Sequence, residues 1–458
     1  MINNSISLGG IGIIDKVEKD FGLVSGIFKG IGGKSKDFEG RVKLLLHNRL
    51  TYAVSVHQIL PTSSDELFEL LGMEDSPSER SLYRTLKTIG QNFSLVHDKY
   101  QLFVKKHNLI TNDQIVDFSS TFLEGNMTTL AKHGHSRDRR PDKPQINFGL
   151  STGTNEIPAA LTISSGNAND HTQIRDMIKV ASRICEKNTL YIFDAGGNSA
   201  TTKKLIRKLE CHYLTLRPKK VETYKKYLRD FKLEDATPML INKRGYFCKK
   251  IKEKNEIKYV FFCEELFDDQ IRKKGDKFKK QVEKGNKTLK KRKKRMMPSD
   301  KGWVVLEPIL QKTLSGITNP YINGTEGFFI LESSVDADSE NTLMQYKDRD
   351  KVENFIRDLK EGIELRPIRH WSRHAIIGSI FISFLAKVLI NLTVKSCKNP
   401  LVKNVKLLKK FLINLTLTVA YPKNAFRLHI VSNVSPPIRA IFDDFLDRYG
   451  QKELDLRW

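Results

Sequence analysis

The sequence predicts a mixed α/β protein whose core is divided by an inserted subdomain and flanked by helical regions. Strand and helix patterns alternate over one stretch of the chain, and an amphipathic helix pattern returns much later. The stretch between them is far longer than a single connection requires. We therefore expect a discontinuous core at residues 109–218 and 338–395, a β-rich basic insertion at 219–337, and helical regions at 1–108 and 396–458.

The chain carries a large excess of positive charge. It has 458 residues, of which 39% are hydrophobic and 29% charged, and its formal net charge is +25. A surplus of this size indicates a polyanionic partner, and nucleic acid is the commonest. An anionic membrane surface is the alternative, but the basic segments adjoin no amphipathic anchor. We expect DNA as the partner and no membrane association.

Three further features indicate a cytoplasmic protein. The five cysteines are scattered without a C-x-x-C pair, which argues against a zinc site and a disulfide framework. The N-terminus lacks a basic n-region, and Asp15 interrupts its apolar stretch, so no signal peptide is expected. The longest apolar run, Ala375 to Ala386, ends at Lys387 and is too short to span a bilayer, which predicts a buried helix.

The N-terminal region contains two helical patterns joined by a short linker with Gly72, Asp75 and Pro77. The second pattern, Glu79 to Ile89, begins at a Ser-Pro-Ser-Glu capping signal. The pair resembles a helix-turn-helix, whose second helix would present basic residues to DNA. A plain helical hairpin is the alternative, because helix-turn-helix sequences are weakly specific. The candidate DNA contacts are Arg80, Tyr83, Arg84 and Lys87.

Residues 109–218 are predicted to form three strands, a helix, a strand, a helix and a final strand. The first strand, QIVDFSSTFL, contains Asp117, which is unusual because strands disfavour aspartate. The fourth strand, TLYIFDAGG, ends in Asp194 and a glycine turn, and a simple turn residue is the alternative reading of Asp194. This order resembles that of the ribonuclease-H-like fold, in which the first and fourth strands are neighbours. The resemblance implies that Asp117 and Asp194 face each other.

A second group of polar side chains lies in the helix pattern at residues 345–360. At 100° per residue, a stripe roughly 60° wide holds one aromatic hydroxyl, two cations and one carboxylate. These are Tyr346, Arg349, Glu353 and Lys360. A carboxylate flanked by cations can hold a metal ion while its neighbours hold phosphates. The alternative is a solvated charged face, in which Glu353 pairs with Arg349 or Arg357 on its own helix.

This pattern resembles the Y-R-E-K signature of prokaryotic insertion-sequence transposases of the DDE class, which belong to the ribonuclease-H-like superfamily. Three further stretches resemble the same group in the same order: GHSRDRRPDKPQINFGL at 134–150, GNANDH at 166–171, and an R-P-x-x-H segment from Arg366. The likeness extends in patches from about residue 110 to 375. It also implies a β-rich insertion before the helix that carries the glutamate.

The insertion contains strand-like patches and one strongly basic run. GYFCKKI, IKYVFFC and GWVVLEP are strand candidates, and NGTEGFFILES leads back into the core as another strand. Residues 272–295 hold fourteen Lys or Arg against two acids. Such a run is usually a solvated polycation. It can also bind phosphates with release of counterions.

The resemblance implies two-metal phosphodiester chemistry. Asp117, Asp194 and Glu353 would be the catalytic carboxylates. They would hold two Mg²⁺ ions, with Mn²⁺ as a substitute, because hard divalent ions prefer oxygen ligands. Two such ions activate the nucleophile on one side of the phosphate and stabilise the leaving oxygen on the other.

The resemblance also implies DNA contacts around these carboxylates. Arg349 and Lys360 would contact phosphates near the cleaved end, and Tyr346 would donate a hydrogen bond to a phosphate. Trp303 would stack on an unpaired base, since this group of transposases is associated with a flipped base at the element end. The alternative for Trp303 is a core position, because its neighbours are apolar.

We expect a DDE transposase that binds the terminal inverted repeats of an insertion sequence, hydrolyses the phosphodiester at the element ends and joins the 3′-hydroxyl ends to target DNA. The resemblance implies a homodimer in the synaptic complex, in a prokaryotic cytoplasm and associated with the nucleoid. Two alternatives stay open. One is a ribonuclease-H-like nuclease that cuts without joining, and the other is a catalytically inactive DNA-binding relic or inhibitor.

Overall fold

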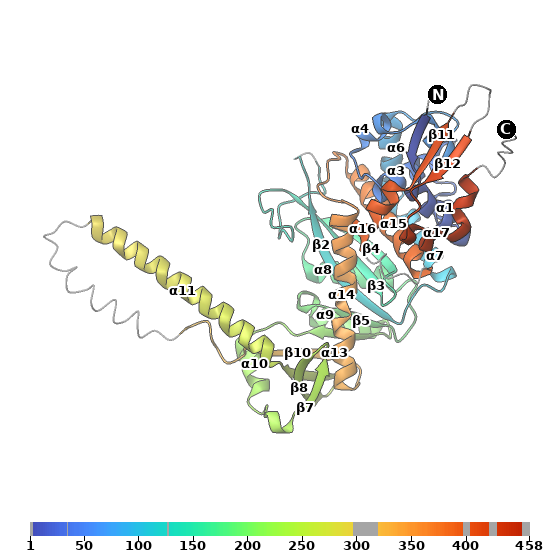
Figure 1. Ribbon diagram of the computed structural model, residues 1–458. Helices are drawn as coiled ribbons and strands as arrows, with labels where there is room; N and C mark the ends of the chain where they lie inside the picture. Colours follow the sequence, from blue (N-terminus) through green and yellow to red (C-terminus); the bar gives the residue numbers. More distant parts are fainter. Residues whose placement is uncertain are drawn as a thin grey trace. The chain divides into compact units, whose positions relative to one another are not determined.

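The computed structural model describes residues 3–33, 35–125, 128–295, 319–396, 404–420 and 428–450. The chain divides into two compact units, the first comprising Met1–Ile192, Ser199–Cys211 and Asp348–Trp458, and the second Phe193–Asn198 and His212–Lys347. Both units combine helices with strands (Figure 1). The predicted mixed α/β class is therefore confirmed.

The first unit contains the opening strands of the predicted core. Three consecutive strands pair antiparallel in the order β4-β3-β2, and β5 pairs with β2 in parallel. Helix α8 (Asp170–Ala181) packs on β3 and β4, and α9 (Ala200–Lys208) packs on α8. The first and fourth strands are neighbours, as the ribonuclease-H-like order requires. The strands are β2 (Asp113–Phe122), β3 (Gln145–Gly153), β4 (Pro158–Ser165) and β5 (Leu190–Phe193).

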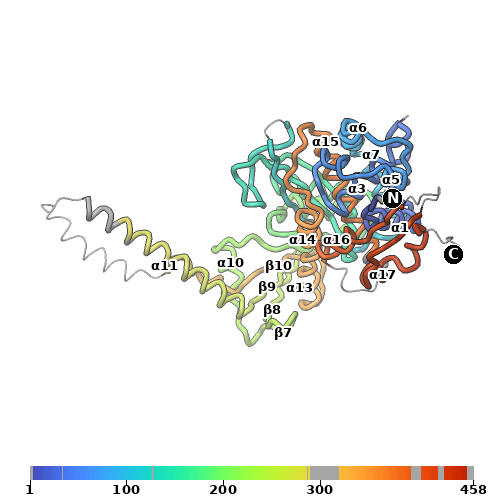
Figure 2. The backbone as a smooth tube through the Cα atoms, turned by 45° about the horizontal axis from the view of Figure 1, so that its top comes forward, coloured from blue at the N-terminus to red at the C-terminus, as the bar shows by residue number. Residues whose placement is uncertain are grey.

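A long apolar helix, α15 (Arg373–Ser396), is central to the helical part of the first unit. It packs against α6 (Glu79–Gln91) and α3 (Phe38–Leu50), and the three helices lie together in Figure 2. Its stretch Arg373–Thr393 is long and apolar enough to cross a membrane by length and composition, yet its most apolar 18-residue window is wholly buried inside the protein. It is the buried helix that the apolar run predicted.

Two glycines bring α6 and α15 into direct backbone contact. A methyl group on Gly378 would lie 2.0 Å from the backbone oxygen of Leu86, and one on Gly90 would lie 1.8 Å from that of His374. Both separations are far below van der Waals contact. The predicted recognition helix is therefore docked on α15, whereas its expected partner in a helix-turn-helix, α5 (Asp65–Leu70), packs on β1.

The flanking regions meet in a small antiparallel sheet. Strand β1 (Asn3–Ser7) pairs with β11 (Thr416–Ala420), which pairs with β12 (Leu428–Ser432) (Figure 1). We expected helices in the flanking regions and did not predict these three strands. A five-residue strand has too short a sequence pattern to be recognised, and the pairing of β1 with β11 spans most of the chain. The remaining elements there are α1 (Gly9–Phe21), α2 (Leu23–Phe28), α4 (Val56–Ile59), η1 (Leu60–Thr62), α7 (Phe93–Lys106), α16 (Val405–Asn414), α17 (Pro436–Phe442) and η6 (Asp443–Tyr449).

The second unit is built on antiparallel strands in the order β6-β10-β9-β8-β7. The patches GYFCKKI and IKYVFFC form β8 and β9, and the returning stretch forms β10, as predicted. The third candidate, GWVVLEP, lies outside the described residues. The elements are β6 (His212–Leu216), α10 (Val221–Leu228), β7 (Thr237–Ile241), β8 (Arg244–Glu253), β9 (Glu256–Phe262) and β10 (Phe328–Ser333).

The basic run lies in a helix. Helix α11 (Glu264–Arg295) contains it and extends away from the strands of its own unit (Figure 1). Its first turns are anchored, because the ammonium of Lys274 lies 2.6 Å from the carboxylate of Glu326 and that of Lys277 lies 4.2 Å from the ring centre of Tyr321. Several of its lysines follow an aspartate or glutamate by four residues, and ion pairs at this spacing stabilise an exposed helix.

The predicted helix at 345–360 is not one continuous α-helix. Helix α13 (Ser339–Lys347) belongs to the second unit, and α14 (Arg349–Arg357) belongs to the first. A π-helical turn, η4 (Asp358–Gly362), follows α14. Because a π-turn has more residues than an α-turn, the angles predicted for Lys360 do not hold. Arg349 and Glu353, four residues apart on α14, keep theirs.

Candidate active site

Asp117 and Glu353 share one cation, the guanidinium of Arg349. The Nη2 atom of Arg349 lies 3.8 Å from the Oδ1 atom of Asp117 and 3.3 Å from the Oε1 atom of Glu353. Asp117 is in the middle of β2, and the other two residues are on α14, which packs on that strand. The structure thus brings together two of the three predicted carboxylates and one predicted phosphate contact.

The sequence of α14 explains this arrangement. Val352, Phe355 and Ile356 are buried, and the ring centre of Phe355 lies 6.3 Å from that of Phe384 on α15. Arg349 and Glu353 are one turn apart, so they project on the same side of the helix. The carboxylate of Glu353 is about half exposed, and the guanidinium of Arg349 is largely covered. A ligand in solvent can therefore reach Glu353 without unfolding the helix.

Asp194 lies directly after β5, at the start of the 3₁₀ turn η2 (Ala195–Gly197). One of its carboxylate oxygens accepts a hydrogen bond of 3.0 Å from the backbone N–H of Gly196. The hydroxyl of Thr215 donates to the backbone oxygen of Asp194 at 3.1 Å. Asp194 therefore caps this turn, and its side chain is exposed.

Lys360 is held by a buried carboxylate that the sequence interpretation did not single out. Its ammonium lies 2.8 Å from the Oδ1 atom of Asp138, which also accepts from Arg366 at 2.8 Å. Burial lowers the pKa of Lys360, and Asp138 opposes that shift. The Oδ2 atom of Asp138 is buried and has no hydrogen-bond partner among the described residues. Asp138 belongs to the GHSRDRRPDKPQINFGL stretch, which carried the signal for it.

The other predicted DNA contacts lie elsewhere. Arg80 and Arg84 are exposed on α6, opposite its buried apolar face. Tyr346 lies on α13 in the second unit, where burial raises the pKa of Tyr224 to about 12 and Tyr346 adds to that shift. Trp303 lies outside the described residues.

The ligand chemistry of Asp117 and Glu353 fits a hard divalent cation. Carboxylate oxygens are the protein ligands that Mg²⁺ and Mn²⁺ prefer, and these two already share the positive charge of Arg349. Across the described ranges, no group of three or more His, Cys, Asp or Glu side chains is close enough to hold a metal ion. Asp117 and Glu353 therefore suit such a cation by the type of their ligand atoms and by their negative charge.

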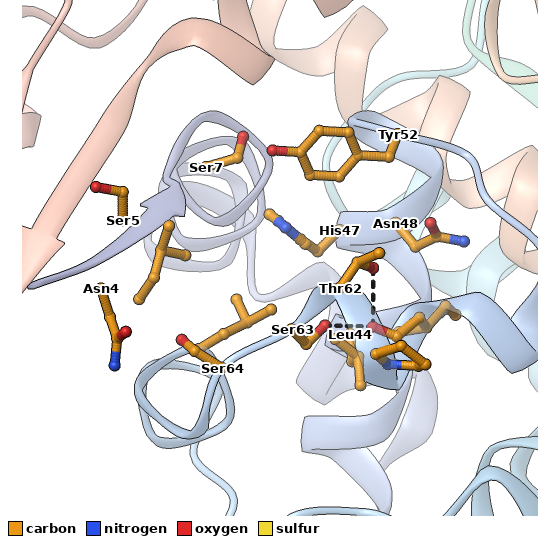
Figure 3. Close-up of a pocket in the computed structure, with 14 residues that line it drawn as sticks. Asn4, Ser5, Ser7, Leu44, His47, Asn48, Tyr52, Thr62, Ser63 and Ser64 are labelled. Atoms are coloured by element: carbon orange, nitrogen blue, oxygen red, sulfur yellow. Dashed lines mark hydrogen bonds between the residues drawn. The ribbon is translucent and has the colours of Figure 1, made fainter.

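A polar cavity of about 260 Å³ lies between β1, α3 and the segment from Ile59 to Leu67 (Figure 3). His47 and Tyr52 line it with several hydroxyl and amide groups. Burial lowers the pKa of His47 to about 4, so its imidazole is neutral near pH 7. None of the predicted site residues lines this cavity. It is separate from the carboxylates on β2 and α14.

Comparison with known proteins identifies the family. A family model described as a transposase DDE domain matches residues 111–389, which is more than half of the chain. The chain belongs to the transposase DDE domain family. The matched DDE domain runs from the start of β2 into α15, so it contains Asp117, Asp194, Arg349, Glu353 and Lys360.

The other comparisons add little to the family match. No curated protein matches this DDE transposase domain protein. It is similar to a chain in a cryo-EM structure of a piggyBac transposase synaptic complex with hairpin DNA, with a TM-score of 0.41 and 11% sequence identity. That alignment covers 89% of this chain and 78% of the other chain.

Proposed function

We propose that the protein is the transposase of a prokaryotic insertion sequence. It binds the terminal inverted repeats of its element, hydrolyses the phosphodiester at the element ends and joins the 3′-hydroxyl ends to target DNA. The observation that carries this proposal is the shared contact of Arg349 with Asp117 and Glu353 inside a transposase DDE domain. Carboxylates that can hold metal ions, beside a cation that can bind a phosphate oxygen, suit metal-dependent phosphate chemistry.

Asp194 is the third carboxylate of the proposed site. Strands β2 and β5 run parallel, with Ile115 opposite Ile192. Asp117 follows Ile115 by two residues, and Asp194 follows Ile192 by two residues. The role of Asp194 rests on the sequence resemblance, which implies one catalytic aspartate on each of the first and fourth strands.

Asp117, Asp194 and Glu353 would hold two Mg²⁺ ions, for which Mn²⁺ can substitute. Such ions lower the pKa of bound water and neutralise charge that develops on the phosphate. The carboxylates fix the ions, and Arg349 provides a fixed positive charge for a phosphate oxygen beside them. Lys360 has a positioning role in the proposed site, because its buried ion pair with Asp138 holds the segment after α14 in place.

The partners and the setting of the reaction belong to the same proposal. DNA is the substrate, both as the element's terminal repeats and as the target. Two copies of the chain assemble on a pair of element ends in a synaptic complex, in which each active site cuts the end that its partner binds. The reaction takes place in the cytoplasm of a prokaryotic cell, at the nucleoid. The excess of positive charge supports a DNA partner.

A strand-transfer assay tests this function. Labelled linear DNA that carries the element's own ends is incubated with a supercoiled target plasmid, the protein and Mg²⁺ or Mn²⁺. We expect label to move into the plasmid only when metal is present. Cut ends without joined product would indicate a nuclease, and binding without any cutting would indicate an inactive DNA-binding protein. Either result would overturn the proposal.

A further inference from the structure

Trp371 is a large aromatic side chain that the fold leaves in solvent. It is 74% exposed, more than any other large hydrophobic residue among those described. It lies in the short segment between the bridge at Ile368 and the start of α15. An exposed indole offers an apolar face and a polar N–H group, which is why tryptophan is enriched on binding surfaces.

The backbone on both sides of Trp371 is fixed. Ile368 donates a hydrogen bond to the backbone oxygen of Phe122 at 3.1 Å, and Glu124 donates to Ile368 at 2.9 Å. On the other side, the hydroxyl of Ser372 accepts from the N–H of Ala375 at 3.1 Å and so caps α15. The indole is therefore presented by a rigid segment, which lowers the entropic cost of binding a partner.

His370 connects this segment to α6. It is buried, and its ring lies edge-on to Tyr83, with ring centres 5.8 Å apart. Tyr83 is itself 37% exposed. The contact between Tyr83 and His370 therefore places α6 beside the segment that carries Trp371.

Exposed cations lie near both aromatic residues in the sequence. On α6, Arg80 precedes Tyr83 by three residues and Lys87 follows it by four, so both lie about one helical turn from the ring, and Arg84 is the next residue along the chain. All three cations are exposed. Arg369 and Arg373 flank Trp371 and are exposed. The N-terminus of α15 adds the positive end of a 24-residue helix. We call these residues the Trp371 surface: Tyr83, Trp371, Arg80, Arg84, Lys87, Arg369 and Arg373.

We propose that the Trp371 surface binds an unpaired stretch of DNA, with a base stacked on Trp371 and the neighbouring phosphates on the arginines and Lys87. Aromatic side chains in a cationic groove are the usual platform for single-stranded nucleic acid. A regular duplex keeps its base faces stacked inside, so it offers the indole no partner. A second copy of the chain carries the same net charge of +25, so repulsion between like charges argues against pairing of two copies through this cationic surface.

This inference rests on the proposed function, because it takes DNA as the substrate of the protein. It adds that some nucleotides are unpaired when they are bound, and it places them on a surface outside the carboxylate cluster. Arg80 and Arg84 gain a role here that does not need a helix-turn-helix. Their helix is docked on α15, so α6 and the Trp371 segment are held together by the same packing.

Tryptophan fluorescence tests the stacking directly. The chain has three tryptophans, Trp303, Trp371 and Trp458. In a variant with Trp303→Phe and Trp458→Phe, only Trp371 emits as a tryptophan. We expect quenching when oligodeoxythymidylate is added and little quenching with a blunt duplex at equal occupancy. Unchanged emission at saturating single strand would overturn the proposal.

An affinity comparison tests its energetic consequence. Trp371→Ala should weaken binding to single-stranded DNA and to a duplex with a single-stranded tail by about 5- to 100-fold, because one stacked base contributes that much. Blunt-duplex binding should stay within about twofold, and Trp371→Phe should retain most of the affinity. The control is Tyr52→Ala, which removes an exposed aromatic ring elsewhere in the first unit. Equal losses for tailed and blunt DNA would contradict the proposal.

Two further measurements distinguish DNA binding by this surface from a role in catalysis or in dimer formation. All binding is measured in the Glu353→Gln background, where no cutting is needed, so failure of the proposed transposase chemistry leaves the result interpretable. The oligomeric state of Trp371→Ala is measured by sedimentation. A change from dimer to monomer without loss of single-strand affinity would show that the surface joins two copies of the chain, and the proposal would be wrong.

Discussion

The ammonium of Lys360 lies 2.8 Å from the carboxylate of Asp138, and both side chains are almost wholly buried. Arg366 reaches the same carboxylate oxygen. This cluster joins the π-turn after α14 to the loop between β2 and β3, two segments more than two hundred residues apart. Lys360, the lysine of the Y-R-E-K pattern, is therefore a buried structural group, and its position depends on Asp138.

Asp138→Asn should destabilise the first unit strongly. The change removes the negative charge that compensates two buried or half-buried cations, and breaking such a buried pair costs about 3–5 kcal/mol. Urea denaturation measures the loss. The control is Asp142→Asn on the same loop, where an exposed aspartate pairs with Arg140, and little change is expected there. Equal effects of the two substitutions would contradict the buried-cluster interpretation.

Gly378→Ala should destabilise the contact between α6 and α15. Its methyl group would lie 2.0 Å from the backbone oxygen of Leu86, which can give way only if one helix shifts. Overpacking of this kind costs about 1–3 kcal/mol or more. Gly26→Ala, on α2 with open space around its Cβ position, is the matched control and should be neutral or slightly stabilising. The thermal unfolding midpoints of the two variants, each compared with that of the wild type, test this prediction.

His47 should make the protein less stable at acidic pH. Its pKa is about 4 in the folded protein because of burial, against 6.5 in the unfolded chain. Between these values only the unfolded chain binds the proton, so the stabilisation is complete above pH 6.5 and falls as the pH drops towards 4. His47→Gln should reduce the loss of stability between pH 7 and pH 5 by about 2 kcal/mol. Urea unfolding at both pH values measures it, with exposed His57→Gln as the control.

Arg349→Ala should reduce DNA cleavage without abolishing DNA binding. The substitution leaves Asp117 and Glu353 without their shared cation and removes a fixed charge next to the phosphate. Loss of one such contact in a phosphate site lowers the rate by about 100-fold. Arg357→Ala, which removes an exposed arginine from the same helix, should keep the rate near that of the wild type. A similar loss for both would mean that helix stability, and not the site, is affected.

The elements that local patterns describe were predictable, and those that long-range pairing creates were not. Alternation and turn residues identified β2 to β5, and the Asp117 strand lies where its pattern predicted. The pairing of β1 with β11 joins the two ends of the chain, so no local window contains it. The π-turn that carries Lys360 has no distinct composition, so nothing in the sequence indicated a departure from a 3.6-residue period there.

The candidate site was partly predictable for the same reason. Arg349 and Glu353 are four residues apart on one helix, so their shared face follows from helical geometry alone. Their approach to Asp117 depends on the packing of α14 on β2, which the resemblance implied but the spacing could not establish. Asp138 and Trp371 were missed because their importance lies in burial and exposure, and the sequence does not specify either.

The most direct test of the proposed active site is a cleavage assay that compares wild-type protein with Glu353→Gln. Labelled linear DNA with the element's ends is cut in Mg²⁺ or Mn²⁺, and binding is measured in parallel. Glutamine keeps the size and the hydrogen bonding of the side chain but removes the charge of the metal ligand. The control is Asp350→Asn, an exposed aspartate on the same helix. We predict that Glu353→Gln binds DNA but does not cut it, while Asp350→Asn does both. Cutting that survives Glu353→Gln would show that the active site lies elsewhere.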